Sequence, residues 1–103
     1  MKVHNLVNSE GRAIANQFVI DGNNERVFQS YDSVVCKVTP DTITFGRDWD
    51  YSNTTRRNLY MFLKYYAGLR EVKGKGIEKA IQTGSFEHIG VTRYHVAYDE
   101  TLY

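Results

Sequence analysis

The stretch DWDYSNTTRRNLYMFL, residues 48–63, contains the point at which the chain changes from strands to helices. Beyond Ser52, apolar and aromatic side chains recur at positions i, i+3, i+4 and i+7, which places them on one helical face. These side chains are Leu59, Phe62, Leu63 and Tyr66. Each of residues 52–54 can cap a helix N-terminus, and Gly68 stands where a helix often ends in glycine. The pattern predicts a helix over residues 54–67.

The first 46 residues follow a different pattern, in which short β-rich runs are separated by turn residues. Side chains that alternate with period two are typical of half-buried strands. In the second run, Ile14, Phe18 and Ile20 share one side. Turns are expected around Gly11 and at the Asp-Gly-Asn-Asn and Thr-Pro-Asp sequences, whose residue types favour reversal of the chain. Because no helix-length insertion separates these five strands, we expect mainly antiparallel neighbours.

Two further elements follow the long helix. Ile77, Ala80 and Ile81 predict a shorter helix over residues 76–83, ended by a glycine. Residues 91–98 alternate again and are expected to return to the sheet. The chain length supports one modest core. We therefore expect a single α+β domain over residues 1–103. It would contain a mainly antiparallel β-meander of about five to six strands, covered on one face by one long and one short helix.

The composition argues against several classes of protein. The formal net charge is +1, which disfavours both a strongly basic nucleic-acid binder and an acidic protein that imitates DNA over its whole surface. Apolar runs are far shorter than the ~20 residues that cross a bilayer, so no membrane partner is expected. The N-terminus lacks the apolar region of a secretory signal, and the single cysteine allows no internal disulfide. A cytoplasmic location is the simplest interpretation.

Residues that could support catalysis or bind a cofactor form no recognisable pattern. Cys36 lies in the middle of a predicted strand, beside Val34 and Val38 on one face, where a buried structural thiol is expected. The three histidines have no metal-ligand spacing, and the glycines between residues 68 and 76 do not match a phosphate-binding loop. Asp48 and Asp50 precede the helix, whose N-terminus stabilises carboxylates, whereas acid–base catalysis would need a buried one with a shifted pKa. We expect no enzyme, no metal and no cofactor.

Arg56 and Arg57 are the residues that a purely structural interpretation of the helix start explains least well, because cations in a first turn oppose the helix dipole. Two explanations are open. Either Asp48 and Asp50 pair with the arginines, or the first turn receives an anion or an acidic partner. Tyrosines nearby add surface of a kind that is enriched in binding sites. The candidate binding residues are Arg56, Arg57, Tyr51, Tyr60 and Lys64.

The region from residue 56 to residue 79 is the electropositive part of the chain, with seven basic residues against Glu71 and Glu78. Beyond the long helix, four of these form a secondary basic patch. They are Arg70, Lys73, Lys75 and Lys79. A solvated surface is one interpretation of this patch, and contact with phosphates is the other.

Three short sequence motifs resemble those of known proteins. NQFVI (residues 16–20), FQSYDSVV (28–35) and WDYSNTT (49–55) resemble a family of short uncharacterised proteins encoded by bacteriophages, plasmids and other mobile elements. The similarity covers roughly residues 14–63. The chain departs from that family in having Asn53 where a basic residue is usual, and Cys36 where a small residue is usual. The resemblance implies no stated activity, but small phage proteins of this kind often bind and block a host component.

These observations favour a non-enzymatic phage or mobile-element protein. We expect an anti-CRISPR or other anti-defence inhibitor that sterically blocks a host protein or ribonucleoprotein in the host cytoplasm. A homodimer is a further possible partner arrangement. The alternatives are a nucleic-acid-binding module that uses residues 56–79 and, third, a small enzyme. An acidic face could also imitate a few phosphates, with contributions from Asp21, Glu25, Asp32, Asp48 and Asp50.

Overall fold

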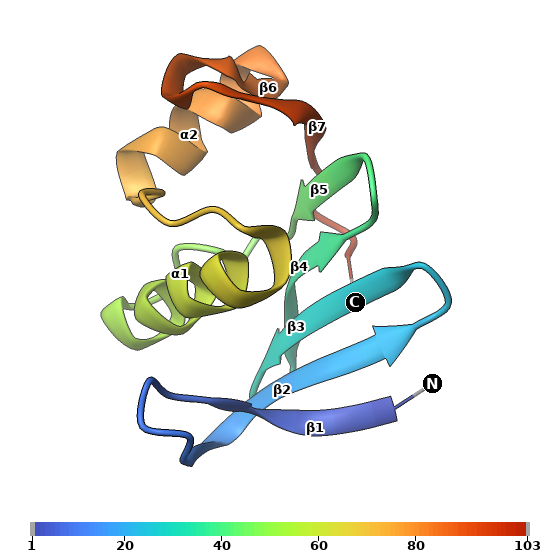
Figure 1. The fold of residues 1–103 in the computed structure, drawn as a ribbon, viewed down its shortest axis with the longest axis vertical. Helices are drawn as coiled ribbons and strands as arrows, with labels where there is room; N and C mark the ends of the chain where they lie inside the picture. Colours follow the sequence, from blue (N-terminus) through green and yellow to red (C-terminus); the bar gives the residue numbers. More distant parts are fainter. Residues whose placement is uncertain (1, 103) are drawn as a thin grey trace.

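The computed structural model describes residues 2–102, which form one twisted seven-stranded sheet with both helices on the same side (Figure 1). The strand order is β1-β2-β3-β4-β5-β7-β6. The strands are β1 (Lys2–Val7), β2 (Ala13–Gly22), β3 (Glu25–Ser30), β4 (Ser33–Val38), β5 (Thr42–Phe45), β6 (Ser85–Phe86) and β7 (Val91–Tyr98). The helices are α1 (Asn53–Ala67), α2 (Gly74–Thr83) and the short 3-10 helix η1 (Glu87–Ile89).

The sheet is antiparallel except for one pair of strands. The first five strands are paired with their neighbours in sequence, as expected for a meander. After β5 the chain passes through α1 and α2, and β7 then returns beside β5 as its parallel neighbour, with Thr42 opposite His95. The predicted α+β class, the antiparallel meander and the two helices are therefore confirmed. The sheet has one or two strands more than expected, because two-residue β6 is too short to show a periodic pattern.

The ends of the helices lie close to the predicted ones. Ser52 is the N-cap of α1, and its Oγ accepts a hydrogen bond of 3.1 Å from the backbone N–H of Thr55. Gly68 ends α1 with φ +69°, a left-handed conformation that favours glycine. The shorter helix begins at Gly74, two residues before the predicted start, because two glycines hide the helical pattern there. No helix within the described residues is both long and apolar enough to cross a membrane.

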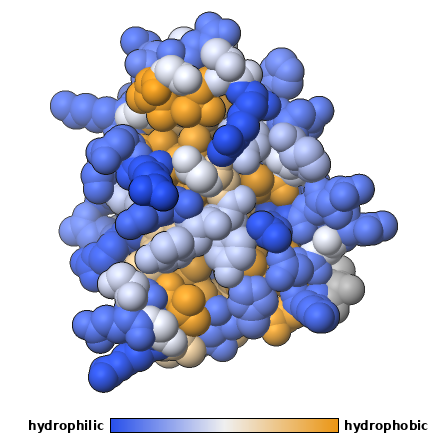
Figure 2. All heavy atoms as spheres, viewed as in Figure 1, coloured by the Kyte–Doolittle hydropathy of each residue, from blue (hydrophilic) through white to orange (hydrophobic). Residues whose placement is uncertain are grey.

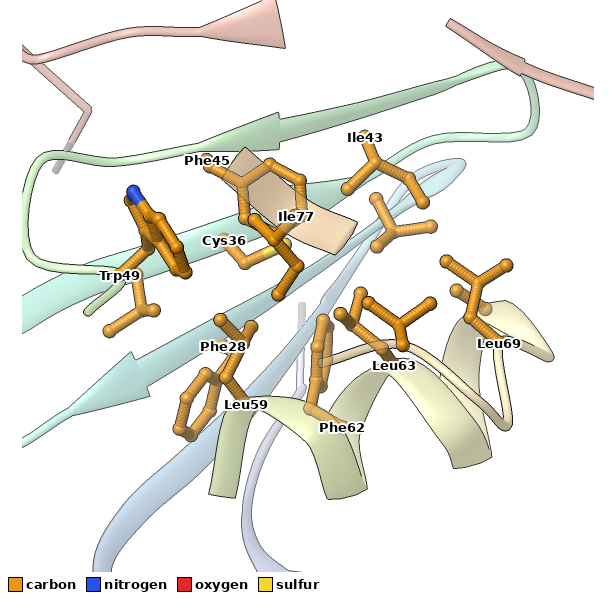
Figure 3. Close-up of a cluster of buried hydrophobic side chains, with 14 of the residues drawn as sticks. Phe28, Cys36, Ile43, Phe45, Trp49, Leu59, Phe62, Leu63, Leu69 and Ile77 are labelled. Atoms are coloured by element: carbon orange, nitrogen blue, oxygen red, sulfur yellow. The ribbon is translucent and has the colours of Figure 1, made fainter. Parts of the chain in front are cut away.

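A single apolar core lies between the helices and the sheet (Figure 3). Leu59, Phe62 and Leu63 point from α1 toward the strands and are fully buried. The ring of Phe62 stacks on that of Phe28 from β3, with 5.5 Å between the centroids. Aromatic pairs of this kind add to the stabilisation that burial of apolar area provides. The predicted apolar face of α1 is therefore the one that holds the helix on the sheet.

The inner face of β2 differs from the one that its apolar residues suggest. Gln17 and Val19 point into the core and are almost completely buried, whereas Phe18 and Ile20 lie on the opposite face and are only half-buried. The cause lies just upstream, where Asn16 has φ +63° and interrupts the regular alternation. Ile14, which precedes the interruption, packs against the core and therefore does not share a side with Phe18 and Ile20 as expected.

A β-bulge in β4 changes the faces expected around the cysteine. Phe28 pairs with Cys36, but the next residue of β3 pairs with Val34, so Val35 is the extra residue. Val35 and Cys36 are both buried, while Val34 is only half-buried and does not share the cysteine's inner face as expected. The prediction of a buried structural thiol is confirmed, and burial raises the pKa of the Cys36 thiol far above its usual range.

Candidate functional site

The surface seen in Figure 2 is mainly hydrophilic, with apolar atoms in separate small patches rather than one broad area. Concave regions are therefore the first places to look for a site. The structure has a hollow of about 400 Å³ between the β3–β4 turn, the loop before α1 and the first turn of α1. We call it the polar hollow. Its lining residues are Ser30, Tyr31, Asp32, Ser33, Val35, Asp48, Tyr51, Ser52 and Thr55.

Two segments that are separate in sequence line the polar hollow, and a third supports one of them. Residues 28–35 supply the β3–β4 turn, and residues 49–55 supply the wall that leads into α1. The third segment, residues 16–20, supports the turn from β2, because the carbonyl of Asn16 accepts a hydrogen bond of 2.7 Å from the N–H of Tyr31. Stretches that are far apart in sequence are thus brought together at one site.

The β3–β4 turn holds Tyr31 in an unusual conformation. This residue has φ +53°, which is uncommon for a residue with a side chain. The bond from its N–H to Asn16 holds it on one side, and on the other its carbonyl accepts a bond of 2.7 Å from the side-chain amide of Gln29. Its side chain remains 59% exposed beside the hollow. Strained residues held by their neighbours are enriched at functional sites.

The loop before α1 is held on β4 by a close backbone contact. The N–H of Gly46 donates a bond of 2.8 Å to the carbonyl of Val35, the bulged residue. A Cβ at Gly46 would lie 2.7 Å from the carbonyl oxygen of Val34, so only glycine allows this approach. Trp49 is buried against Phe45, with 6.2 Å between the ring centroids, and anchors the loop in the core.

Asp48 and Tyr51 take different positions on this anchored loop. Asp48 accepts a hydrogen bond of 2.8 Å from the hydroxyl of Ser33, which joins the loop to the β3–β4 turn. Tyr51 is 78% exposed and stands at the edge of the hollow. The polar hollow therefore combines a turn and a loop that are held by hydrogen bonds and core packing with two exposed tyrosines.

Buried polar side chains continue from the hollow into the protein. Ser30 and Thr55 line the hollow and are almost completely buried. Gln17 pairs with Ser30 across β2 and β3, on the same face of the sheet. Within residues 2–102, Gln17 Oε1 is buried without a hydrogen-bond partner. Such a buried acceptor is costly, and it lies next to the residue that forms part of the hollow wall.

The polar hollow carries uncompensated negative charge. Asp32 and Asp48 line it, and none of its lining residues is basic. The N-terminus of α1 contributes roughly half a positive charge, which is well below the two carboxylate charges. The lining also lacks histidine and cysteine, the side chains that most often act as a base or nucleophile with a carboxylate.

A second hollow, of about 440 Å³, has charges that are already paired. There Asp21 Oδ1 lies 3.0 Å from Arg26 Nε, and Asp21 Oδ2 lies 3.2 Å from His4 Nε2. Burial, together with the negative charge of Asp21, raises the pKa of Tyr66 on its wall. Because the charges balance internally, this hollow has less electrostatic attraction for an ionic ligand.

The expectation of one acidic face is wrong. Asp21 and Glu25 lie at the second hollow, where Glu25 pairs with Lys37 at 3.9 Å. Asp32 and Asp48 lie at the polar hollow instead. Asp21 and Glu25 lie beside the start of β3, whereas Asp32 and Asp48 lie near the turn that follows its end, so the length of this strand separates the two groups.

Of the two explanations left open for the first-turn arginines, pairing with Asp48 and Asp50 does not occur among the described residues. Arg56 Nη1 donates a bond of 2.9 Å to the backbone carbonyl of Asp50, and Nη2 donates to the side-chain oxygen of Asn53. Among the described residues, no carboxylate forms an ion pair with Arg56 or Arg57. Asp48 does not pair with the arginines because its carboxylate already accepts a hydrogen bond from Ser33. Arg57 is exposed on the surface of α1.

The other predicted binding residues do not form one site. Tyr51 lines the polar hollow. Tyr60 is a residue of α1 whose side chain reaches the start of α2, where Lys73 Nζ is 5.2 Å from its ring centroid and its hydroxyl approaches Gly74. Arg56 approaches the same glycine. Lys64 lies over the ring of Tyr65 at 5.6 Å. The rest of the basic patch, Arg70, Lys75 and Lys79, is exposed.

The sequence analysis did not single out Tyr31 or Ser33, and it named Asp32 only as part of an acidic face. The signal was present, because the word Ser-Tyr-Asp-Ser lies between two β-rich runs where a tight turn is expected. What the sequence does not contain is the contact between this turn and the loop before α1, which the core packing of Trp49 creates.

Comparison with known proteins places the chain in a family. No curated protein and no solved structure matches it. The model of a family of unknown function, DUF8033, matches residues 1–79. The match is longer than the predicted similarity over residues 14–63, and it contains every residue that lines the polar hollow. It ends within α2, before β6 and β7. The chain therefore belongs to the DUF8033 family, whose function is unknown.

Proposed function

We propose that this chain is a non-enzymatic binding protein that uses the polar hollow and its two exposed tyrosines to dock on a partner protein. The partner would be a host defence protein or ribonucleoprotein, and the effect would be steric, because a bound domain of this size covers a functional surface. The observation that carries the proposal is the convergence of residues 30–35 and 48–55, which are separate in sequence, on one hollow with two exposed tyrosines.

Tyr31 and Tyr51 support a binding role for this surface. Their side chains are 59% and 78% exposed, although tyrosine is usually at least half-buried when it serves only the fold. Tyrosine provides a large contact area with little loss of side-chain freedom, and it is enriched where binding energy is concentrated. The hydrogen-bonded backbone at Tyr31 and the anchored loop before Tyr51 fix the backbone from which both rings project before a partner arrives. Such preorganisation lowers the entropic cost of binding.

The chemistry of the hollow favours binding over catalysis. Of its two acidic residues, Asp48 is held by a hydroxyl, and no histidine, lysine or cysteine is among the lining residues. The single thiol of the chain is buried in the core, where its raised pKa keeps it protonated and unreactive. The setting in a bacterial host comes from the resemblance to mobile-element proteins, which favours an anti-CRISPR or related anti-defence role in the host cytoplasm.

A second candidate function, nucleic-acid binding, is favoured by one observation. Arg56, Tyr60 and Lys73 converge at the start of α2, where no acidic residue occupies the first turn. A phosphate would be attracted by these cations, and Tyr60 could stack on a base. The formal net charge of +1 argues against a large electrostatic contribution.

Phage plating tests the main proposal. The chain would be expressed in bacterial strains that each carry one active defence system, either CRISPR or restriction, and plated with a phage that the system blocks. We expect the chain to restore plating in at least one strain, and Tyr31→Ala/Tyr51→Ala to lose this effect. Tyr65→Ala is the matched control, because Tyr65 is 45% exposed on α1 away from the hollow. Unchanged plating in every strain, or full activity of the double variant, would overturn the proposal.

Binding to single- and double-stranded DNA and RNA tests the second candidate. Phosphate contacts are strongest at low salt, so fluorescence anisotropy at ~50 mM salt gives the most sensitive measurement. If the second candidate is right, binding weakens steeply with added salt and is lost in Arg56→Glu/Lys73→Glu. No change in anisotropy at ~50 mM salt would exclude it.

A further inference from the structure

We infer that the polar hollow receives the guanidinium group of an arginine side chain on the partner protein. This inference rests on the proposed function, because it names the chemical group that the docking surface recognises. Three independent properties of the lining residues support it: charge, hydrogen-bonding capacity and aromatic surface.

Charge selects a cation. Asp32 and Asp48 bring two negative charges to the hollow, and no basic residue lines it. The N-terminus of α1 offsets only about half a charge, so roughly −1.5 remains. Arg56, which follows Thr55 of the lining, is held by the carbonyl of Asp50 and by Asn53 instead of by these carboxylates. Arg47, which precedes Asp48 in sequence, is exposed, does not line the hollow and forms no ion pair with a carboxylate of the described residues. An incoming anion would be repelled, whereas a cation would complete the site.

Hydrogen-bonding capacity selects a group with many donors. Ser33 already donates its hydroxyl hydrogen to Asp48 at 2.8 Å. Ser52 donates its own to the hydroxyl of Thr55 at 3.1 Å. These oxygens can therefore offer only lone pairs to a ligand, in addition to the lone pairs of the two carboxylates. Two hydroxyl oxygens and two carboxylates of the lining are thus available as acceptors for a ligand with several donors.

Aromatic surface distinguishes a guanidinium from a compact ammonium. Tyr31 and Tyr51 both line the hollow with largely exposed rings. A planar guanidinium stacks on tyrosine and has five N–H donors in a fixed arrangement, so it can satisfy several separate acceptors at once. A lysine ammonium has three donors and is more strongly hydrated. Arginine therefore fits this combination of walls and acceptors better than lysine.

The second hollow shows what a filled site of this kind looks like within the same chain. There Arg26 bonds to Asp21 at 3.0 Å and its guanidinium lies 5.3 Å from the ring centroid of Tyr66. Carboxylate, tyrosine and arginine together form an intramolecular version of the contact that we infer. The polar hollow has the carboxylates and the tyrosines, but its lining contains no arginine.

An NMR titration with short peptides tests this inference. The ¹⁵N-labelled protein would be titrated with acetyl-Gly-Arg-Gly-amide, with the citrulline analogue, which keeps the shape without the charge, and with the lysine analogue. We expect saturable shifts at the amides of Tyr31, Asp32, Asp48 and Tyr51, with affinity for the arginine peptide at least tenfold above that for the citrulline peptide. The lysine peptide should bind more weakly than the arginine peptide.

Charge variants locate the effect. Asp48→Asn keeps an oxygen that accepts from Ser33 and should reduce affinity for the arginine peptide at least fivefold. Asp32→Asn, at an exposed position, provides the same test if Asp48→Asn folds poorly. Asp50→Asn is the matched control, because Asp50 is close in sequence but does not line the hollow. The affinity of this variant for the arginine peptide should stay within twofold of that of the unchanged protein.

Three results would overturn the inference. They are equal affinity for the citrulline peptide, shifts centred on Arg56 and Lys73 instead of the hollow, and no shifts with any peptide. These outcomes are distinguishable from failure of the proposed function. If Tyr31→Ala/Tyr51→Ala loses its effect on phage plating but the arginine peptide does not bind, the docking surface stands and the inferred ligand is wrong.

Discussion

Ser33 donates a hydrogen bond of 2.8 Å to Asp48 across fifteen residues of sequence, and this contact joins the β3–β4 turn to the loop that leads into α1. The turn carries Tyr31 and the loop carries Tyr51, so the bond sets the two walls of the polar hollow relative to each other. It is charge-assisted and partly buried, which makes it stronger than an ordinary surface hydrogen bond. The stability and the shape of the hollow therefore both depend on it.

Ser33→Ala should lower the free energy of unfolding by about 1–2 kcal/mol, because a partly buried carboxylate loses its hydroxyl donor. Urea unfolding followed by the fluorescence of buried Trp49 measures the change. Ser9→Ala is the control, since Ser9 is exposed in a turn and its replacement should change stability by less than about 0.5 kcal/mol. Equal stabilities of the two variants would show that the bond contributes nothing.

Gly46→Ala and Gly76→Ala should have opposite effects. At Gly46 a Cβ would lie 2.7 Å from the backbone oxygen of Val34, so the loop must move and stability should fall by about 1–3 kcal/mol. At Gly76 the nearest atom would be 3.8 Å away, and alanine in α2 should raise stability by up to about 1 kcal/mol. Thermal unfolding measures both variants. A stabilising Gly46→Ala would contradict the close approach of this loop to β4.

The Cys36 thiol should make the protein less stable in alkaline solution. Burial raises its pKa in the folded state, so the folded protein keeps a proton that the unfolded chain loses above about pH 8.5. This contribution to stability is fully present below that pH and is lost as the pH rises, with a slope approaching about 1.4 kcal/mol per pH unit. Tyr66, whose pKa is also raised, adds to the loss at still higher pH.

Urea unfolding between pH 8 and pH 10 measures this slope. Cys36→Ala should be less stable at pH 8, because it leaves a small cavity in the core, but its stability should fall less between pH 8 and pH 10. In the native protein the thiol should not react with a disulfide reagent at pH 8, whereas the urea-unfolded chain should react fully. Rapid reaction of the native protein would contradict the burial of Cys36.

The elements with strong local patterns could be predicted from the sequence. The apolar face of α1, led by Leu59 and Phe62, and the glycine that ends the helix are determined by neighbours within one or two turns. The antiparallel meander follows from short connections between β-rich runs. By contrast, the bulge at Val35 and the left-handed Asn16 change which side chains face inward without any change in composition. Period-two patterns cannot reveal such single-residue shifts.

The candidate site was only partly predictable for the same reason. Tyr51 was identified because it belongs to the distinctive stretch before α1. Tyr31 and Asp32 reach the same hollow through the packing of β4 against a distant loop, which depends on Gly46 and Trp49 together. Charge complementarity did not predict the partners of Arg56, because its guanidinium donates to a backbone carbonyl and to a side-chain amide instead of to a carboxylate.

Site-specific photocrosslinking in host cells tests the docking surface most directly. The photoreactive residue benzoylphenylalanine would replace one tyrosine at a time, at Tyr31, Tyr51, Tyr60 or Tyr65. Binding through the polar hollow predicts one host protein crosslinked from Tyr31 and Tyr51, and no adduct of that protein from Tyr60 or Tyr65, which do not line the hollow. Adducts formed from Tyr60 or Tyr65, with none from Tyr31 and Tyr51, would contradict the claim that the hollow is the binding site.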